Sequence, residues 1–342
     1  MMILVSGGAG YIGSHTCVEL VAAGYDILVA DDLSNSNVKV LERLKRITGK
    51  DIRFVRIDFR DAAATEKLFW ENPEIDAVIH FAGFKAVGES VREPLKYYTN
   101  NLGSTMSILN AMKRFNVGKI VFSSSATVYG DPETLPIKED SPLSAASPYG
   151  ATKLMIERIL TDCGVASQDL RVALLRYFRP IGAHKSGLIG EDPRCIPNNL
   201  LSYITQVAVG KLDELKVFGG DYETPDGTGI RDYIHVVDLA IGHVAALRRL
   251  ESRKAGVNES CLVYNLGTGV GYSVLEVVEA FKNASGVDIP YKITGRRQGD
   301  VPRCYADPTK ASEELGWKAE RGIGEMCADA WNWQKNNPNG YE

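Results

Sequence analysis

The stretch Gly7-Gly8-Ala9-Gly10-Tyr11-Ile12-Gly13 decides the fold that we predict for the first part of the chain. It follows a short apolar run at residues 3–6 and precedes helical apolar spacing over residues 16–23. A second apolar run, residues 25–30, ends at Asp31. The order of strand, glycine-rich turn, helix, strand and acid is typical of a unit that binds a dinucleotide.

The glycine turn and the acid each have a physical reason. One glycine allows a tight turn, another lets the backbone approach a pyrophosphate, and the helix N-terminus offers amides and partial positive charge to that anion. Asp31 stands where a carboxylate accepts hydrogen bonds from both hydroxyls of an adenosine ribose, and Asp31 and Asp32 together disfavour a 2′-phosphate. The pattern therefore favours NAD over NADP. The alternative is an ordinary glycine turn beside an acidic surface pair.

Further apolar runs alternate with helical segments along the chain. They cover residues 52–57, 77–80, 120–122 and 170–175. This alternation predicts an α/β fold with a Rossmann-type, doubly wound parallel sheet. Ligands of such sheets collect at the carboxyl ends of the strands. Residues 94–115 fit one long helix.

We expect two lobes, because 342 residues are more than one hydrophobic core usually serves. Residues 1–178 should form the NAD-binding Rossmann domain. Residues 179–342 should mainly form a smaller, mixed α/β lobe, since long polar loops alternate there with shorter helices. Residues near 233–268 should return to the first domain, because 263–266 form one more apolar strand.

The composition argues against several classes of protein. The net charge of −4 gives little general attraction to nucleic acid or to an anionic membrane surface. We see no secretion leader and no apolar run long enough to span a bilayer. The six cysteines are scattered without a Cys-x-x-Cys pair, which is typical of reduced thiols. We expect a cytoplasmic protein with no metal site and no nucleic-acid or membrane partner.

Tyr149 and Lys153 share one helix face, because they are four residues apart in the stretch Ser147-Pro148-Tyr149-Gly150-Ala151-Thr152-Lys153. Pro148 suits the first turn of a helix. A fixed ammonium beside a buried phenol favours the phenolate, so we predict a lowered pKa for Tyr149 and a general base near neutral pH. The same spacing also occurs on solvated helix surfaces.

Taken together, the motifs resemble an extended short-chain dehydrogenase/reductase and, within that group, the UDP-glucose 4-epimerase family. The glycine motif and the Tyr-x-x-x-Lys pair carry the wider resemblance, together with Ser-Ser-Ser-Ala-Thr-Val-Tyr-Gly at 123–130. The closer resemblance rests on residues 81–90, 182–184, 190–193, 196–200, 226–229 and 231–235.

The resemblance implies an isomerase of galactose metabolism that interconverts UDP-glucose and UDP-galactose through a 4-keto sugar, with tightly bound NAD. Tyr149 would remove the proton of the 4-hydroxyl while C4 gives hydride to the nicotinamide. Ser125 would hydrogen-bond the same oxygen, and Lys153 would hold the nicotinamide ribose. The keto sugar would turn over in the pocket and receive hydride on its other face.

The resemblance also implies the binding residues and a homodimer paired through residues 94–115 and 149–160. The expected NAD contacts are Gly7, Gly10, Tyr11, Ile12, Gly13, Asp31, Asn35, Ser36, Asp58, Phe59, Phe81, Ala82, Gly83, Lys85, Asn100, Ser123, Tyr149, Lys153 and Phe178. The expected UDP-sugar contacts are Lys85, Ser125, Tyr149, Arg179, Asn199, Leu200, Lys216, Val217, Phe218, Arg231, Arg297, Asp300 and Cys304.

Three positions depart from the usual family pattern. Arg179 replaces an asparagine, and we expect it either to add a phosphate contact or to obstruct the substrate. Some members carry a large aromatic side chain at the position of Cys304. The smaller cysteine leaves room there for a 2-acetamido group. UDP-N-acetylglucosamine and its galacto epimer are therefore expected as substrates too. Cys195 replaces a common glycine, and we have no physical account of that change.

Two alternatives remain at this stage. A nucleotide-sugar 4,6-dehydratase uses the same tyrosine and lysine but needs an acid/base pair, typically an Asp-Glu that follows a threonine. Here the segment reads Ser125-Ala126-Thr127, with no carboxylate. A non-enzymatic NAD-binding regulator would be expected to have lost the tyrosine or the lysine.

Overall fold

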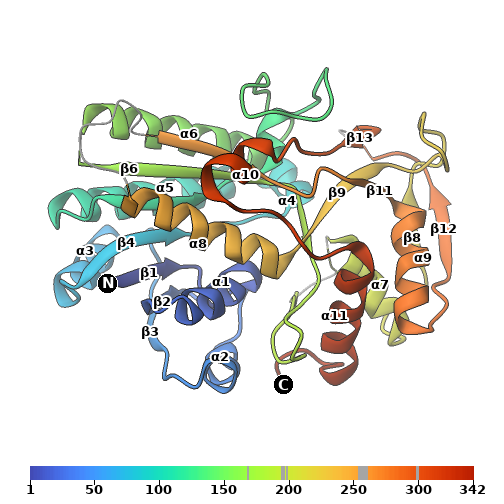
Figure 1. Cartoon of the computed structure of the whole chain (residues 1–342), viewed down its shortest axis with the longest axis horizontal. Helices are drawn as coiled ribbons and strands as arrows, with labels where there is room; N and C mark the ends of the chain where they lie inside the picture. Colours follow the sequence, from blue (N-terminus) through green and yellow to red (C-terminus); the bar gives the residue numbers. More distant parts are fainter. Residues whose placement is uncertain (168, 194–196, 198, 253–260, 298–299) are drawn as a thin grey trace.

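Seven parallel strands form one sheet in the computed structural model of the chain, which describes residues 1–167, 169–193, 197, 199–252, 261–297 and 300–342. Their order is β10, β6, β5, β4, β1, β2, β3 (Figure 1), as in a doubly wound dinucleotide-binding sheet. The predicted fold class is confirmed. The strands are β1 Met2–Ser6, β2 Asp26–Asp31, β3 Arg53–Arg56, β4 Ile75–His80, β5 Lys119–Ser123, β6 Arg171–Tyr177 and β10 Cys261–Leu266.

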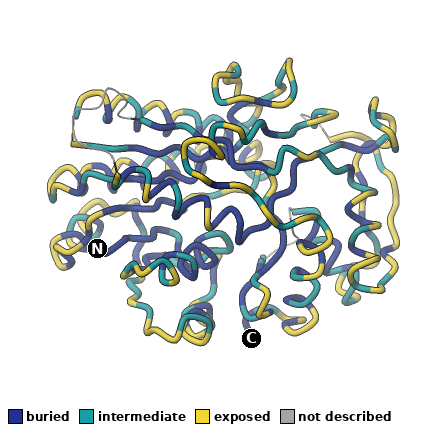
Figure 2. Tube along the Cα trace, in the orientation of Figure 1, coloured by how far each residue is buried: buried dark blue, intermediate teal, exposed yellow. Residues whose placement is uncertain are grey.

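Helices cover both faces of this sheet. On β1, Ile3 and Val5 pack into one hydrophobic cluster while Met2 and Leu4 pack into the other. Because both faces are covered, β1, β2, β4, β5 and β6 are mostly apolar and run buried through the molecule (Figure 2), whereas the edge strand β3 is partly exposed. The first cluster includes residues of α1 Tyr11–Ala22, α2 Val40–Thr48 and α8 Val236–Ser252, and the second includes residues of α3 Ala62–Glu71, α5 Pro94–Arg114 and α6 Pro148–Ala166.

The remaining strands and helices build a smaller lobe with a third core cluster. One small sheet joins β7 Arg179–Ile181, β9 Ile230–His235, β11 Gly271–Ser273 and β13 Arg303–Cys304, and β8 Leu215–Phe218 pairs with β12 Tyr291–Thr294. The helices of this core are α7 Leu200–Ala208, α9 Val274–Ser285 and α11 Ile323–Asn336. The short elements α4 Val87–Arg92, η1 Ala126–Tyr129 and α10 Thr309–Leu315 complete the set described.

The chain leaves the large sheet after β6, crosses to β7 and later returns to the sheet. β10 pairs with β6 at the edge of the sheet, and α8 contributes Leu247 and Leu250 to the core around β1. The boundary near residue 178 and the extent of the returning segment stay predictions. None of the helices in the described part of the chain has the length and hydropathy needed to cross a membrane.

Helix limits differ little from those predicted, with one exception. α5 spans residues 94–114, close to the predicted 94–115. α1 begins at Tyr11 rather than near residue 16, and its N-cap is Gly10 in an extended conformation. The first turn of the helix therefore lies inside the glycine stretch, where too few apolar side chains occur to give a helical period. Cys195 lies outside the described residues.

Candidate active site

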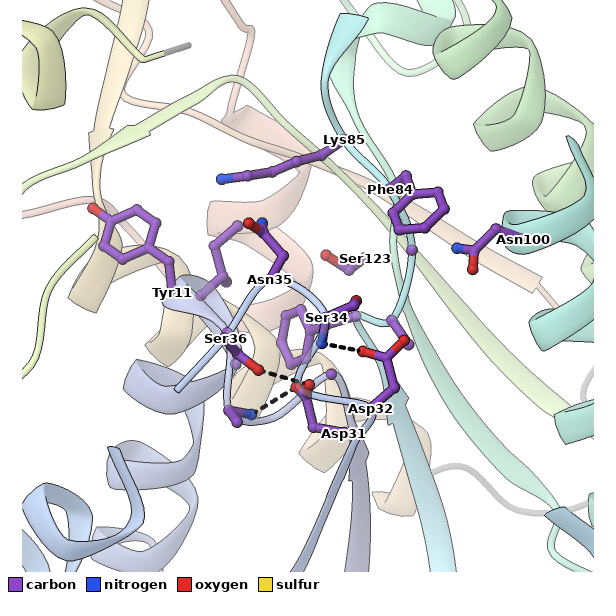
Figure 3. A pocket seen from close by; sticks show the side chains of 18 of the residues that line it. Tyr11, Asp31, Asp32, Ser34, Asn35, Ser36, Phe84, Lys85, Asn100 and Ser123 are labelled. Atoms are coloured by element: carbon purple, nitrogen blue, oxygen red, sulfur yellow. Dashed lines mark hydrogen bonds between the residues drawn. The ribbon is translucent and has the colours of Figure 1, made fainter. Parts of the chain in front are cut away.

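A cavity of about 460 Å³ lies at the carboxyl ends of β1, β2, β4 and β5 (Figure 3). Every residue that we expect to contact NAD, except Phe178, lines it. Phe178 is buried instead in a small cluster with Val128, Tyr129 and Ile137. The lining also contains residues that the sequence did not single out as contacts, among them Asp32, Ser34, Tyr97, Tyr177, Gly190, Glu191, Asp192, Pro193 and Tyr341.

The glycine turn forms the floor of the cavity because side chains would not fit there. Gly7 has a φ of +72°, and a Cβ on it would lie 2.7 Å from the backbone nitrogen of Ala82. A Cβ on Gly13 would collide with the carbonyl oxygen of Gly7. Bare backbone at the start of α1 is therefore exposed to the cavity, which suits a pyrophosphate.

Asp31 ends β2 at the wall of the cavity and is held by three donors. Its carboxylate accepts hydrogen bonds from the backbone nitrogens of Ala9 at 3.1 Å and Leu33 at 2.9 Å, and from Ser36 Oγ at 2.8 Å (Figure 3). Burial raises the pKa of Asp31, and these hydrogen bonds oppose the rise. Neighbouring Asp32 accepts a hydrogen bond from the Ser34 backbone at 2.8 Å. A carboxylate fixed in this way can accept a hydrogen bond from a ribose hydroxyl.

Helix α6 brings Tyr149 and Lys153 to the wall of the cavity. Ser147 caps the helix by accepting a hydrogen bond from the Gly150 backbone, and Pro148 occupies its first turn. Lys153 Nζ donates to the carbonyl oxygen of Ser123 at 2.8 Å and lies 5.9 Å from the centre of the Tyr149 ring.

The pKa values of this pair differ from the prediction. Burial raises the pKa of Tyr149 well above its usual value, and Tyr177 adds to the rise, while the Ser125 hydrogen bond and the charge of Arg179 oppose it. The prediction of a lowered pKa for Tyr149 is therefore wrong for this structure. The Lys153 ammonium is directed to the Ser123 carbonyl, and its own pKa is lowered by burial to about 8. Desolvation disfavours the charged form of both groups.

Lys85 reaches across the cavity to the smaller lobe, and Figure 3 shows its side chain extended toward Tyr11. Its Nζ lies 2.9 Å from Glu191 Oε1. Both oxygens of Glu191 also accept from Asn199 Nδ2 at 2.8 Å, and Ser202 donates a further short hydrogen bond. Burial alone would raise the pKa of Glu191, but Lys85 and these donors lower it. One carboxylate thus joins an expected NAD contact to an expected substrate contact.

A second group of candidate residues gathers in the smaller lobe. Asp300 lies 3.8 Å from the Arg231 guanidinium and 3.0 Å from Arg297 Nε, and Arg297 stacks over the Phe218 ring at 4.5 Å. Cys304 pairs with Arg231 across β13 and β9. Together with Arg179, these arginines form a group of three guanidinium groups that could bind an anion, although Asp300 already pairs with two of them.

Arg179 connects the two groups. It lies on β7 beside β9, and its positive charge acts on both Arg231 and Tyr149. Burial lowers the pKa of Arg231, and the charge of Arg179 lowers it further. In the described part of the chain the Arg179 guanidinium makes no hydrogen bond or ion pair, so its charge is available to an anion.

For some predicted contacts, the position of the side chain does not by itself indicate a contact with NAD or the substrate. Val217 is 1% exposed in the core of the smaller lobe, so that only its backbone can meet a ligand. Lys216 is exposed on β8, and Leu200 begins α7. Asp58 pairs with Arg60 at 2.5 Å. Ser125 caps η1 and does not line the main cavity, although its side chain opposes the rise in the pKa of Tyr149.

Sequence reasoning missed Tyr177 and Glu191. Tyr177 ends β6, and the Ser123 hydroxyl donates to its oxygen at 2.9 Å. Its position at the carboxyl end of a parallel strand was a usable signal. Glu191 lies in a loop, and no periodicity marks it.

Comparisons with known proteins agree on one family. Residues 4–330 match a family model described as GDP-mannose 4,6 dehydratase. The chain is 62% identical to UDP-glucose 4-epimerase of Bacillus subtilis, over 100% of this chain and 99% of that protein.

Two solved structures show the same similarity in three dimensions. UDP-glucose 4-epimerase from Bifidobacterium longum, in complex with NAD+ and UDP, superposes with a TM-score of 0.94 at 55% identity, covering 99% of this chain and 100% of that one. The UDP-Glc/GlcNAc 4-epimerase of Campylobacter jejuni gives a TM-score of 0.84 at 37% identity, with 98% and 99% covered.

Proposed function

The chain belongs to the UDP-glucose 4-epimerases of the extended short-chain dehydrogenase/reductase family, and we propose that it inverts C4 of UDP-glucose, UDP-galactose and their 2-acetamido counterparts. This is an isomerase activity with NAD as the cofactor, and we place it in galactose metabolism. The observation that carries the proposal is the position of Tyr149 and Lys153 at the wall of a dinucleotide cavity, with Arg179 linking Tyr149 to the arginines of the smaller lobe.

The residues of the cavity fit NAD. The floor at Gly7 has no room for a side chain, and Asp31 faces the cavity as a fixed acceptor. When bound, NAD supplies the hydride acceptor and donor. Lys153 is placed to hold the nicotinamide ribose and to keep positive charge near Tyr149.

Tyr149 transfers the proton in both directions. It removes the proton of the 4-hydroxyl as C4 is oxidised and returns it after the keto sugar has turned over. Burial disfavours the phenolate, so positive charge is needed beside it. Lys153 and Arg179 supply such charge from the protein. Ser125 opposes the rise in the pKa of Tyr149, and its hydroxyl can share the proton.

The smaller lobe anchors the nucleotide while the sugar stays free to turn. Arg231 and Arg297 are positioned for the diphosphate, and Phe218 offers a ring that is already stacked by Arg297. Both faces of C4 must meet the same nicotinamide, so binding energy has to come from the UDP rather than from the hexose.

Other chemistries fit the site less well. Dehydration across C5 and C6 needs an acid/base pair beside the sugar, but Ser125 is followed by Ala126 and Thr127 in η1. The matched family's description names a dehydratase, and this segment argues against that reaction here. A regulator without catalysis would not need Tyr149, Lys153 and Ser125 together.

We propose a homodimer in the cytoplasm. The five described cysteines are free thiols, which suits a reducing compartment. Leu95 and Met106 are exposed on one face of α5, eleven residues apart, and Met155 is exposed on the adjacent α6. An apolar face of two packed helices is suited to a second copy of the same face.

Sedimentation velocity should show two chains per particle. Met106→Glu should shift the protein toward monomers, because a carboxylate would be buried at the interface. Val270→Glu, at an exposed site in the smaller lobe, is the matched control and should leave the dimer intact. A monomeric wild type would refute the dimer.

The central experiment incubates purified protein with UDP-galactose or, separately, with UDP-N-acetylgalactosamine and identifies the product sugars. We expect UDP-glucose and UDP-N-acetylglucosamine. Tyr149→Phe should lower kcat by roughly 10²–10⁴-fold, because only the proton-transferring oxygen is lost. Tyr291→Phe, at an exposed position on β12, is the control. If the wild type converts neither substrate, the proposed function is wrong.

Cys304→Tyr should lower kcat/KM for the N-acetylated substrate at least about ten-fold, because the ring would occupy the space beside the 2-substituent. The activity on UDP-galactose should be retained. Cys304→Ala should keep both activities. Equal loss of both activities in Cys304→Tyr would contradict the assignment of this space.

Arg179→Asn should lower kcat/KM for UDP-galactose by roughly ten-fold, because a charge-assisted contact contributes about 1.5–3 kcal/mol. Arg296→Asn, which removes a surface ion pair with Asp221, should have little effect. A rise in kcat/KM for Arg179→Asn would show that the arginine obstructs the substrate.

A further inference from the structure

Three residues of α6, one turn apart, face three successive serines at the end of β5. Lys153 donates to the Ser123 carbonyl at 2.8 Å, and the Ser125 side chain lowers the pKa of the Tyr149 phenol. The third residue of this face is Glu157, whose Oε1 accepts the Ser124 hydroxyl at 2.5 Å. Tyr149 and Lys153 belong to the proposed catalytic set, whereas Glu157 has no role in it so far.

Glu157 is a buried charge with a buried partner. Its side chain is 4% exposed and that of Arg176 on β6 is 5% exposed, with Arg176 Nη2 at 2.7 Å from Glu157 Oε2. Arg176 also donates to the Tyr129 hydroxyl at 3.1 Å and to the Glu139 carbonyl at 2.9 Å. A buried ion pair is often no more stabilising than apolar residues of the same volume, so a role in stability alone does not explain it.

Glu157 is also the charged group placed to act on Lys153. The Phe122 ring lies 4.7 Å from Lys153 Nζ, and His80 on β4 faces it. Burial lowers the pKa of His80 to about 3, with Lys153 adding to the effect, so His80 is neutral near pH 7. Tyr177 on β6 is neutral too, because burial raises its pKa. Among the groups described around Lys153, Glu157 supplies the negative charge and Arg176 behind it the opposing positive one.

We propose that Glu157 is a positioning residue for the epimerase reaction, one that fixes Ser124, and through it Ser125, and that places a carboxylate one helical turn from Lys153. The proposal rests on the proposed function. Its two parts act through different atoms: Oε1 holds the serine segment, and the net charge acts on the ammonium one turn away. Burial lowers the pKa of Lys153 to about 8, and Glu157 opposes that shift.

The sign of the pH effect follows from the charge. Without the carboxylate the ammonium is less favoured, so the pKa of Lys153 falls further. Lys153 then loses its proton at a lower pH, and with it the charge that favours the Tyr149 phenolate. The alkaline limb of the profile of kcat/KM against pH should move to lower pH.

The test compares Glu157→Gln with wild type, using UDP-galactose across the pH range. The glutamine keeps the shape and an acceptor for Ser124 but removes the charge. We expect the alkaline limb to move down by roughly one pH unit. The fall in kcat/KM should come from a lower kcat rather than from a higher KM. If Glu157→Gln does not fold, as judged by circular dichroism, Glu157→Gln/Arg176→Gln avoids an unpaired buried charge. Because Arg176 opposes the charge of Glu157, the limb of this double variant should move in the same direction but by less.

Two further variants separate the parts. Ser124→Ala keeps the ion pair and should lower kcat several-fold at every pH without moving the limb. Asp238→Asn breaks a different buried acid–arginine pair, Asp238 with Arg321 on the far face of the sheet, and should lower the melting temperature with the limb unmoved. If the alkaline limb of the pH profile is the same in Glu157→Gln and in wild type, the proposal is overturned. If the wild type is inactive, the proposed function is overturned instead.

Discussion

The hydrogen bond from Lys153 to the Ser123 carbonyl is the interaction on which the rest of the site depends. It ties the face of α6 to the carboxyl end of β5, the strand that opens onto the dinucleotide cavity. A lysine that is 6% exposed cannot be held by solvent, so its position is set by that carbonyl and by the Phe122 ring. Tyr149, one turn earlier on the same helix, is placed by the same bond.

Burial that positions these groups also works against their chemistry. It favours the neutral form of both the phenol and the amine, raising one pKa and lowering the other. Two nearby charges oppose this effect of burial. The charge of Arg179 lowers the pKa of Tyr149, and the charge of Glu157 raises the pKa of Lys153. Preorganised charge of this kind costs no rearrangement during the reaction, which is why it is effective for catalysis.

Sequence reasoning found the parts of the molecule that rest on local patterns. The strands were visible as apolar runs, and the glycine stretch fixed where the cavity lies, because Gly7 and Gly13 leave no space for a Cβ. The pKa of Tyr149 was out of reach, since it depends on burial by β6 and on where Lys153 points. Glu191 was missed for a similar reason: its partners Lys85 and Asn199 come from different lobes.

Charged groups couple the two lobes at the cavity, in addition to the apolar cluster that the lobes share. Glu191 binds Lys85 on the cofactor side and Asn199 on the nucleotide side, so a shift of either lobe changes both. Arg179 makes the second connection, because one guanidinium influences both the proton-transferring tyrosine and the anion-binding arginine. An anion bound at Arg231 would partly neutralise the positive charge around Arg179 and thereby reduce its support for the phenolate. Lys153 then has to supply the remaining charge, and the Glu157 carboxylate one turn away opposes the loss of its proton.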